Sequence, residues 1–276
     1  MRHVISTHLF VNHRLTVALV DRIAKAGIGE IEIFVARQHL DYHNGAQIEE
    51  LGHWFRDSAL KLHSMHAPMY SDTVWWRTGP NAVVSITEST KGKRIAAIDE
   101  IKRALEVAEL IPCRYLIQHI GVSGEEYSDR AVEAAFSSLE ELSIFAGQRG
   151  VEVLVENIPN ALSTAERLVE FVNRTHLPLH FVFDAGHAHI MGGVAPSFEL
   201  MKDRISSTHV HDNDGQNDTH VFPTRRPAGG IDWKQTMELL RSGQDRFPLL
   251  LELREVPDME RPLDEVRRVF DFLEEQ

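Results

Sequence analysis

Histidines and carboxylates gather in the segment "THVHDNDGQNDTH", residues 208–220 of the chain. The segment contains His209, His211, Asp212, Asp214, Asp218 and His220. Imidazole nitrogens and carboxylate oxygens bind divalent metal ions, and histidine is the commonest metal ligand among side chains. A solvated surface loop is the alternative interpretation of such a segment. Since the chain has 16 histidines, the positions of the others decide between the two.

A metal site needs ligands from several segments, and the hydrophobic pattern predicts the elements that bring them together. Short apolar runs alternate with longer amphipathic stretches, as buried parallel strands alternate with covering helices. We expect strands at residues 3–10, 30–35, 62–68, 114–121, 151–159, 179–187, 207–214 and 248–255. Eight such alternations predict the α/β class and a single (β/α)8 TIM barrel, with residues 1–276 forming one domain.

Amphipathic helices are clearest in four segments. Apolar residues recur at three- and four-residue spacing in residues 16–28, 163–174, 232–242 and 263–275. Ser163 and Glu166 form a capping-box pattern at the start of the second segment. The longest irregular stretch, residues 69–90, follows the third strand and has the length of a functional lid. Its Trp75 or Trp76 either covers a substrate or packs the loop against the barrel.

The formal net charge of −12 restricts the partners of the chain. Such a charge repels a nucleic-acid backbone, and the tract "TRRP", residues 224–227, is too short to bind a duplex. The single cysteine, Cys113, excludes an intramolecular disulfide. No apolar run reaches the ~18 residues of a membrane span, and the first residues lack the layout of a signal peptide. We expect a cytoplasmic protein with a small-molecule substrate and no membrane partner, and a homo-oligomer is compatible with the sequence.

Polar residues follow the later strands at the ends where a TIM barrel builds its active site. The candidates are His66, His119, Glu156, Asp184, His187, His209, His211 and Glu252, with Asp218 and His220 in the loop after the seventh strand. Segment 208–220 is therefore expected to form one wall of a larger site at the barrel mouth.

The carboxylates among these candidates indicate more than a structural role. An isolated histidine at a strand end is usually a hydrogen-bonded structural residue. Glu156, Asp184 and Glu252 each follow an apolar run, however, and a buried carboxylate needs a cation or a hydrogen-bond donor. His209 and His211 are two positions apart, so both face the same side of their strand.

The order of these motifs resembles that of the xylose isomerase-like TIM barrels. This superfamily includes sugar phosphate isomerases and epimerases, ketose 3-epimerases and the endonuclease IV family. The resemblance covers nearly the whole chain and rests on "HAP" (66–68), "QHIG" (118–121), "VEN" (155–157), "DAGH" (184–187), "HVHDND" (209–214), "DTH" (218–220), "GGIDW" (229–233) and Glu252 in the last strand. Each motif is weak alone, and their order at successive strand ends makes the resemblance specific.

For the epimerase branch, the resemblance implies an isomerase or epimerase of a small sugar-like hydroxycarbonyl compound. It implies one divalent metal (Mn²⁺, Mg²⁺, Co²⁺ or Zn²⁺) bound by Glu156, Asp184, His211 and Glu252. The same two glutamates would transfer protons on opposite faces of the substrate, through an enediolate that the metal stabilises. His187 would act with them by contacting a substrate oxygen.

Further substrate contacts are expected from His66, His119, Arg225, Arg226, Trp75 and Trp76. The two arginines are included because these epimerases carry an arginine a few residues after the metal-binding histidine. This chain has Asn217 at that position.

Endonuclease IV relatives offer a second interpretation, a phosphodiesterase that cleaves abasic DNA with up to three zinc ions. By resemblance, the zinc sites would be His66, His119 and Glu156; Glu156, Asp184, His211 and Glu252; and His187, Asp218 and His220. The negative charge and the lack of a basic recognition loop favour the sugar isomerase. A non-catalytic metal- or sugar-binding barrel is the third interpretation, and the presence of every ligand position argues against it.

Overall fold

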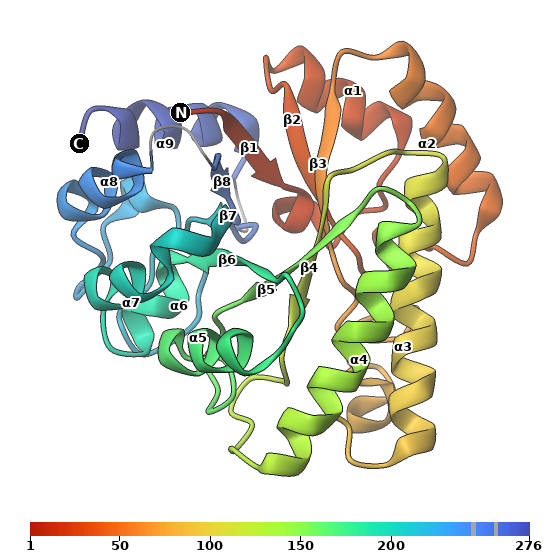
Figure 1. The fold of residues 1–276 in the computed structure, drawn as a ribbon. Helices are drawn as coiled ribbons and strands as arrows, with labels where there is room; N and C mark the ends of the chain where they lie inside the picture. Colours follow the sequence, from red (N-terminus) through yellow and green to blue (C-terminus); the bar gives the residue numbers. More distant parts are fainter. Residues whose placement is uncertain (244–246, 257–258) are drawn as a thin grey trace.

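Parallel strands form the centre of the molecule (Figure 1). The computed structural model describes residues 1–243, 247–256 and 259–276. Its eight-stranded sheet has the order β7-β6-β5-β4-β3-β2-β1-β8. The strands are β1 (His3–Ser6), β2 (Glu30–Phe34), β3 (Lys61–His66), β4 (Tyr115–His119), β5 (Glu152–Glu156), β6 (His180–Asp184), β7 (Ile205–His209) and β8 (Leu249–Leu251).

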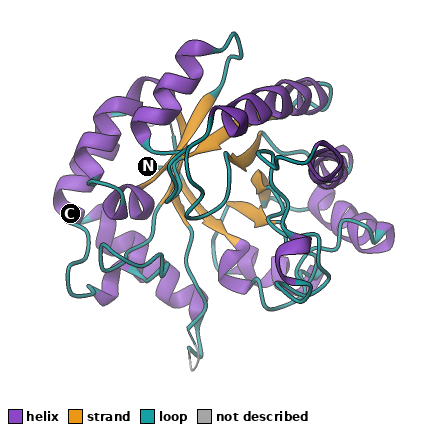
Figure 2. Cartoon of the chain, turned by 90° about the horizontal axis from the view of Figure 1, so that it is seen from below, coloured by secondary structure: helices purple, strands orange, loops and turns teal. Residues whose placement is uncertain are grey.

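Backbone hydrogen bonds around Val210 join the two ends of this strand order. The Val210 N–H donates to the carbonyl of Leu250 at 2.8 Å, and its carbonyl accepts from the N–H of Glu252 at 3.2 Å. In Figure 2 the strands occupy the centre and the helices lie around them. The predicted (β/α)8 barrel is confirmed.

Helices cover the outside of the strands. They are α1 (Val17–Lys25), α2 (Gly45–Asp57), α3 (Lys91–Leu105), α4 (Asp129–Gly147), α5 (Ala165–Arg174), α6 (Ala185–Ile190), α7 (Val194–Met201), α8 (Trp233–Ser242) and α9 (Pro262–Glu274). The four amphipathic segments correspond to α1, α5, α8 and α9. Apolar spacing therefore located these helices correctly, because each must bury one face against the barrel.

The predicted capping box at the start of α5 is wrong. Thr164 is the N-cap, and its hydroxyl accepts from the N–H of Arg167 at 3.3 Å. Ser163 is fully buried, and its hydroxyl donates to the carbonyl of Ile120 at 2.7 Å. The Ser163 side chain thus fastens the loop after β4, and the next residue caps the helix.

Several strands end earlier than their apolar runs predict. β6 ends at Asp184, and α6 begins at the next residue. β1 ends at Ser6, where the 3-10 turn Thr7–Phe10 follows. β7 ends at His209, two residues before His211. The last residue of each of these three strands is therefore polar, and the rest of the predicted run lies outside the strand.

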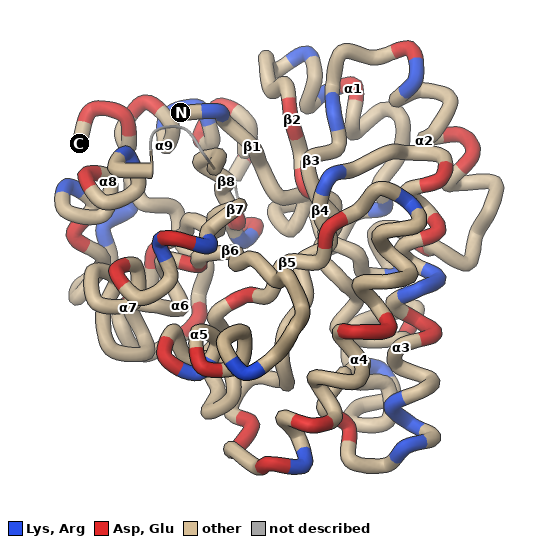
Figure 3. The backbone as a smooth tube through the Cα atoms, in the orientation of Figure 1, with Lys and Arg blue, Asp and Glu red and all other residues tan. Residues whose placement is uncertain are grey.

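Charged residues are spread over the outer helices and loops, where both signs occur (Figure 3). Acidic residues also occur within the barrel wall, where β2 carries Glu30 and Glu32. Glu32 is fully buried, which is unusual for a carboxylate unless it has partners. No helix in the described ranges is long and apolar enough to cross a membrane.

Candidate metal centre

Five consecutive strands, β3 to β7, end on a potential metal ligand. Their last residues are His66, His119, Glu156, Asp184 and His209, and Glu252 directly follows β8. Because parallel strands bring their C-terminal ends to the same side of a barrel, these side chains meet at the mouth. They form two groups of ligand atoms, and His187, His211, Asp218 and His220 form a third.

The first group, which we call the acidic cluster, contains Glu156, Asp184, His209 and Glu252, all buried. Nδ1 of His209 lies 3.0 Å from Oε1 of Glu156, 3.4 Å from Oε2 of Glu252 and 3.8 Å from Oδ2 of Asp184. Oδ2 of Asp184 is buried and has no hydrogen-bond partner among the described residues. Three carboxylates around one imidazole, with an oxygen left unpaired, form a donor set that fits a divalent cation.

The acidic cluster contains His209, whereas the sequence interpretation expected His211 as the histidine ligand beside these carboxylates, and that expectation stays a prediction. Asp184 and His209 are direct register partners in the β6–β7 pair, so their side chains start at the same level of the barrel. His211 lies two residues further on, with Nε2 3.2 Å from Oδ1 of Asp184. The signal for His209 was present in the sequence, since it directly ends a strand as Glu156 does.

Glu32, on β2, contacts the acidic cluster from inside the barrel. Its Oε2 accepts from the Ser64 hydroxyl at 2.7 Å and lies 3.3 Å from Nε2 of His209. A carboxylate at Nε2 favours the proton on that nitrogen and leaves the Nδ1 lone pair directed at the cluster. The sequence interpretation missed Glu32, although a glutamate inside the apolar strand "EIEIF" signals a buried charge.

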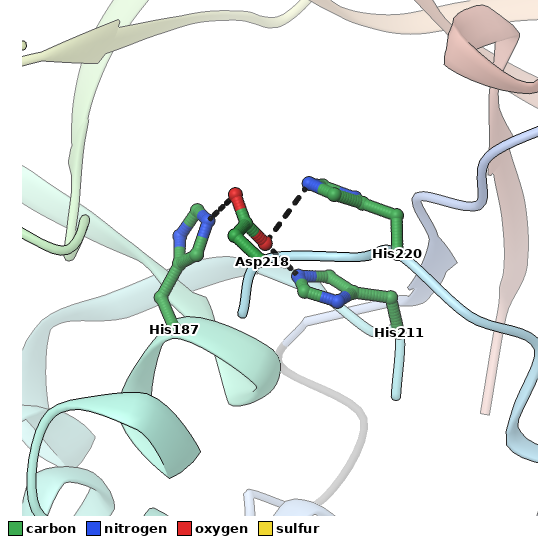
Figure 4. A group of neighbouring side chains, drawn as sticks. All are labelled: His187, His211, Asp218 and His220. Atoms are coloured by element: carbon green, nitrogen blue, oxygen red, sulfur yellow. Dashed lines mark hydrogen bonds and ion pairs between the residues drawn. The ribbon is translucent and has the colours of Figure 1, made fainter. Parts of the chain in front are cut away.

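The second group, the histidine cluster, contains His187, His211, Asp218 and His220. Figure 4 shows the Asp218 carboxylate between the three imidazoles. Its oxygens lie 3.2 Å from Nε2 of His187, 3.3 Å from Nε2 of His220 and 3.8 Å from Nε2 of His211. Nδ1 of His211 has no hydrogen-bond partner among the described residues, although the ring is fully buried. An unpaired buried nitrogen of this kind suits a metal ligand.

Gly186 of the "DAGH" motif makes room for this cluster. A Cβ atom at Gly186 would lie 2.1 Å from Cε1 of His211. The His211 ring in turn stacks on His220, with centroids 3.9 Å apart and planes inclined by 19°. A side chain at position 186 would therefore displace the ring.

The third group, the bridging cluster, contains His66, His119 and Glu156. Nε2 of His119 lies 3.1 Å from both Nε2 of His66 and Oε2 of Glu156. Glu156 belongs to this group and to the acidic cluster, using one oxygen in each. A carboxylate placed in this way can bridge two cations.

Backbone carbonyls set the orientation of three of the histidines. Nδ1 of His66, His187 and His220 lies 2.9 Å from the carbonyl oxygens of Ala67, Asn157 and Glu252, respectively. A carbonyl only accepts hydrogen bonds, so Nδ1 carries the proton and Nε2 is free for a ligand. This arrangement is typical of metal-binding histidines.

The imidazoles and carboxylates shift each other's pKa in opposite directions. Burial disfavours the charge on His209, but Glu156 and Glu252 outweigh it and raise the pKa of His209 well above its usual value. Burial also opposes charge on His220, yet Asp218 raises its pKa to about 9. Burial would raise the pKa of Glu156, but His209 holds that pKa well below its usual range. Glu156 is therefore ionised, and protons on His209 and His220 balance a charge that a metal ion would otherwise balance.

A cavity of about 340 Å³ opens above the clusters. Glu156, His187 and Glu252 line it, together with His66, His119, Asp218 and His220. His8, which the sequence interpretation did not select, also lines it, with Nδ1 3.1 Å from the carbonyl of Leu253. Burial, with the nearby His220, lowers the pKa of His8 well below its usual value, so this imidazole is neutral.

Residues 20–276 match the sequence model of the xylose isomerase-like TIM barrels. The chain belongs to this family. The probable endonuclease 4 of Natronomonas pharaonis is 26% identical over 157 residues, which cover 52% of this chain and 55% of that protein.

Solved structures show the same barrel. A D-tagatose 3-epimerase-like protein has a TM-score of 0.78 at 21% identity and covers 100% of this chain and 97% of its own. The IOLI protein with a zinc atom has a TM-score of 0.79 at 18% identity, with coverage of 99% and 98%. At these identities the likeness establishes the fold that the xylose isomerase-like proteins share.

The structure separates the candidate substrate residues of this xylose isomerase-like barrel. Trp76 lines the cavity, whereas Trp75 is half-buried and packs edge-on against Phe34 at 5.5 Å. Arg225 and Arg226 do not line it. Their segment turns toward α9, where the Arg226 guanidinium lies 5.0 Å from the ring centre of Phe272.

Two aspartates of segment 208–220 have structural partners instead. Asp212 accepts from the N–H of Ile231 at 3.0 Å and from Nε1 of Trp233 at 2.8 Å, which ties the segment to the start of α8. Asp214 accepts from the N–H of Asn217 at 2.7 Å. The motif "GGIDW" thus serves to hold the loop that carries the histidine cluster.

Proposed function

We propose that the chain is a divalent-metal-dependent isomerase or epimerase of a small sugar-like hydroxycarbonyl compound. One observation carries this proposal. Two buried carboxyl groups, of Glu156 and Glu252, both approach Nδ1 of His209 and both line one cavity. Epimerisation needs one group to remove a proton from carbon and another to return one, and a carboxylate can do the first while a carboxylic acid does the second.

Different residues bind the metal ion, transfer protons and orient the substrate in the proposed reaction. Asp184 and His209 hold the cation together with the two glutamates, and oxygen and imidazole donors suit Mn²⁺, Mg²⁺, Co²⁺ or Zn²⁺. When bound, the ion supplies Lewis-acid polarisation of the substrate carbonyl. Glu156 takes the carbon-bound proton as a carboxylate, and Glu252, in its carboxylic acid form, returns one to the other face or the neighbouring carbon; proton exchange with solvent then restores both groups. His187 orients a hydroxyl through Nε2, because its Nδ1 is held by the Asn157 carbonyl.

Glutamine substitutions test the proton transfer. Glu156→Gln and Glu252→Gln should each lower turnover by about 10²–10⁴-fold, since an amide cannot accept the proton. Conversion and deuterium incorporation from D₂O would be followed on free ketoses, with metal content determined in the same samples. Glu152→Gln is the matched control, because Glu152 begins the strand that Glu156 ends. Normal turnover by both variants with metal bound would exclude this mechanism.

A multi-zinc phosphodiesterase is the second candidate function. It is favoured by the closeness of the three clusters, two of which share Glu156. Metal analysis of protein purified without chelator distinguishes the two, with one ion per chain for the isomerase and three zinc ions for the phosphodiesterase. Cleavage of an abasic duplex, with binding that weakens steeply as salt rises, would replace the first proposal by the second.

A further inference from the structure

The side chains that line the cavity are of two chemical kinds. One kind is the metal-type ligands of the clusters, and the cavity volume of about 340 Å³ lies near the lower end of small-ligand pockets. The other kind, which we call the apolar wall, comprises Phe34, Met69, Tyr70, Trp76, Val84 and Ile158. A polyol that hydrogen-bonds on all sides would leave hydroxyl groups against this wall without partners, at a cost in free energy.

Trp76 extends the apolar wall to the surface. Its side chain is 54% exposed, and it packs edge-on against Tyr70 with ring centres 5.4 Å apart. Its backbone is left-handed, with φ of 59°, which is unfavourable for a residue with a bulky side chain. Val122, from the loop after β4, also lines the cavity and is 37% exposed. Large apolar side chains left exposed at a cavity mouth indicate a surface that an apolar ligand covers.

Carboxyl groups line the cavity, but no lysine or arginine of the described ranges does. The acidic residues are Glu156, Asp218 and Glu252, and apart from His8 the lining histidines belong to the metal-type clusters. A phosphate group is normally bound by arginine, lysine or a helix N-terminus. Away from the metal ligands, a phosphate group would meet apolar side chains and uncharged polar ones, namely His8, Tyr70, Gln118 and Ser123.

We propose that the substrate is uncharged and has two parts, a hydroxylated end that faces the clusters and an apolar group, aryl or alkyl, that packs against Trp76 and its neighbours. This inference rests on the proposed function, because it assigns the hydroxylated end to that reaction. It adds a binding site for the apolar group, formed by the loop 69–90, the end of β2 and the loops after β4 and β5.

Paired ligands test the site without catalysis. The probes are methyl β-D-glucoside, phenyl β-D-glucoside and D-glucose 6-phosphate, titrated calorimetrically into Mn²⁺-loaded protein. The two glucosides share the sugar ring and differ only in the apolar group. We expect the phenyl glucoside to bind at least about tenfold more tightly, with a more negative heat-capacity change, because its ring is buried. The phosphate ester should bind more weakly than either glucoside.

Variants test which side chain causes the preference for the phenyl glucoside. Trp76→Ala should reduce the preference for the phenyl glucoside at least about fivefold and leave binding of the methyl glucoside unchanged. Ile144→Ala is the control, since Ile144 is an exposed apolar residue of α4 that does not line the cavity. Melting temperatures would show that both variants are folded.

Three results would overturn the inference: equal affinity for the two glucosides, a preference that persists in Trp76→Ala, or tightest binding of D-glucose 6-phosphate. If Trp76→Ala fails to fold, the affinities of wild-type protein for the two glucosides still test the inference. Failure of the proposed function is a separate outcome, in which the phenyl preference is present but no ketose is turned over by the metal-loaded protein.

Discussion

Replacing Glu32 with glutamine tests whether the acidic cluster depends on a carboxylate that lies outside it. Glu32 is fully buried, and its Oε2 faces the Ser64 hydroxyl at 2.7 Å and Nε2 of His209 at 3.3 Å. Glutamine has the same shape but no charge. If its carbonyl keeps the Ser64 hydrogen bond, its NH₂ group can face Nε2 of His209. The proton of the imidazole would then be favoured on Nδ1, the nitrogen that faces Glu156 and Glu252.

The expected magnitude follows from the role of such partners. Loss of a hydrogen-bond partner behind a metal-binding histidine costs about 10–100-fold in metal affinity. This corresponds to about 1.4–2.8 kcal/mol. The three carboxylates of the cluster are unchanged, so we expect weakened binding and not its abolition.

A competition titration measures this effect directly. Wild-type protein and Glu32→Gln would compete with a chromophoric chelator for Zn²⁺ at one pH, and melting of the metal-free proteins would check the fold. Glu30→Gln is the matched control, because Glu30 lies on the same strand but is paired with Arg2 at 2.8 Å. If Glu32→Gln binds zinc as tightly as Glu30→Gln, Glu32 does not orient His209.

Three further predictions concern other parts of the chain. Gly186→Ala should displace the His211 ring, lower the free energy of unfolding by about 1–3 kcal/mol and reduce metal bound at the histidine cluster; urea titration and metal analysis check this, and wild-type values in both would contradict it. Burial lowers the pKa of His39 to about 4, whereas an unfolded chain binds that proton near 6.5. Stability should therefore fall as the pH drops from 6.5 to 4, by up to about 1.4 kcal/mol per pH unit for this residue, and His39→Gln should show a shallower dependence in urea titrations at several pH values. Thr164→Ala should lower the free energy of unfolding by about 0.5–2 kcal/mol through loss of the α5 cap; a melting temperature equal to that of the wild type would refute the assignment.

The sequence by itself determined the barrel and the direction in which its site opens. Apolar runs that end in Glu156 or Asp184 identify strands whose last residue carries a charge. Parallel strands bring such ends together whatever the details of their packing, so local patterns were sufficient. The glutamate within "EIEIF" was equally visible, but its partner on β7 was not, because β2 and β7 are not neighbours in the sheet.

Only the tertiary structure decided how the ligands divide into clusters. His209 and His211 face the same side of their segment, so alternation alone does not distinguish them. Their levels along the barrel axis depend on the stagger between β6 and β7, which pairs Asp184 with His209. Stagger is set by the packing of the whole barrel and leaves no local signal.

Tertiary contacts also determine which loop side chains line the cavity. Arg225 and Trp76 both belong to segments near the barrel mouth, but only Trp76 lines the cavity. The direction of a loop side chain depends on what the loop packs against. The loop that carries Asp212 packs against the start of α8. The Asp212 carboxylate accepts a hydrogen bond from Trp233 there, although the residues next to Asp212 in the sequence resemble metal ligands. Strand ends are positioned by a regular backbone, whereas loop side chains are positioned by contacts between segments distant in the sequence.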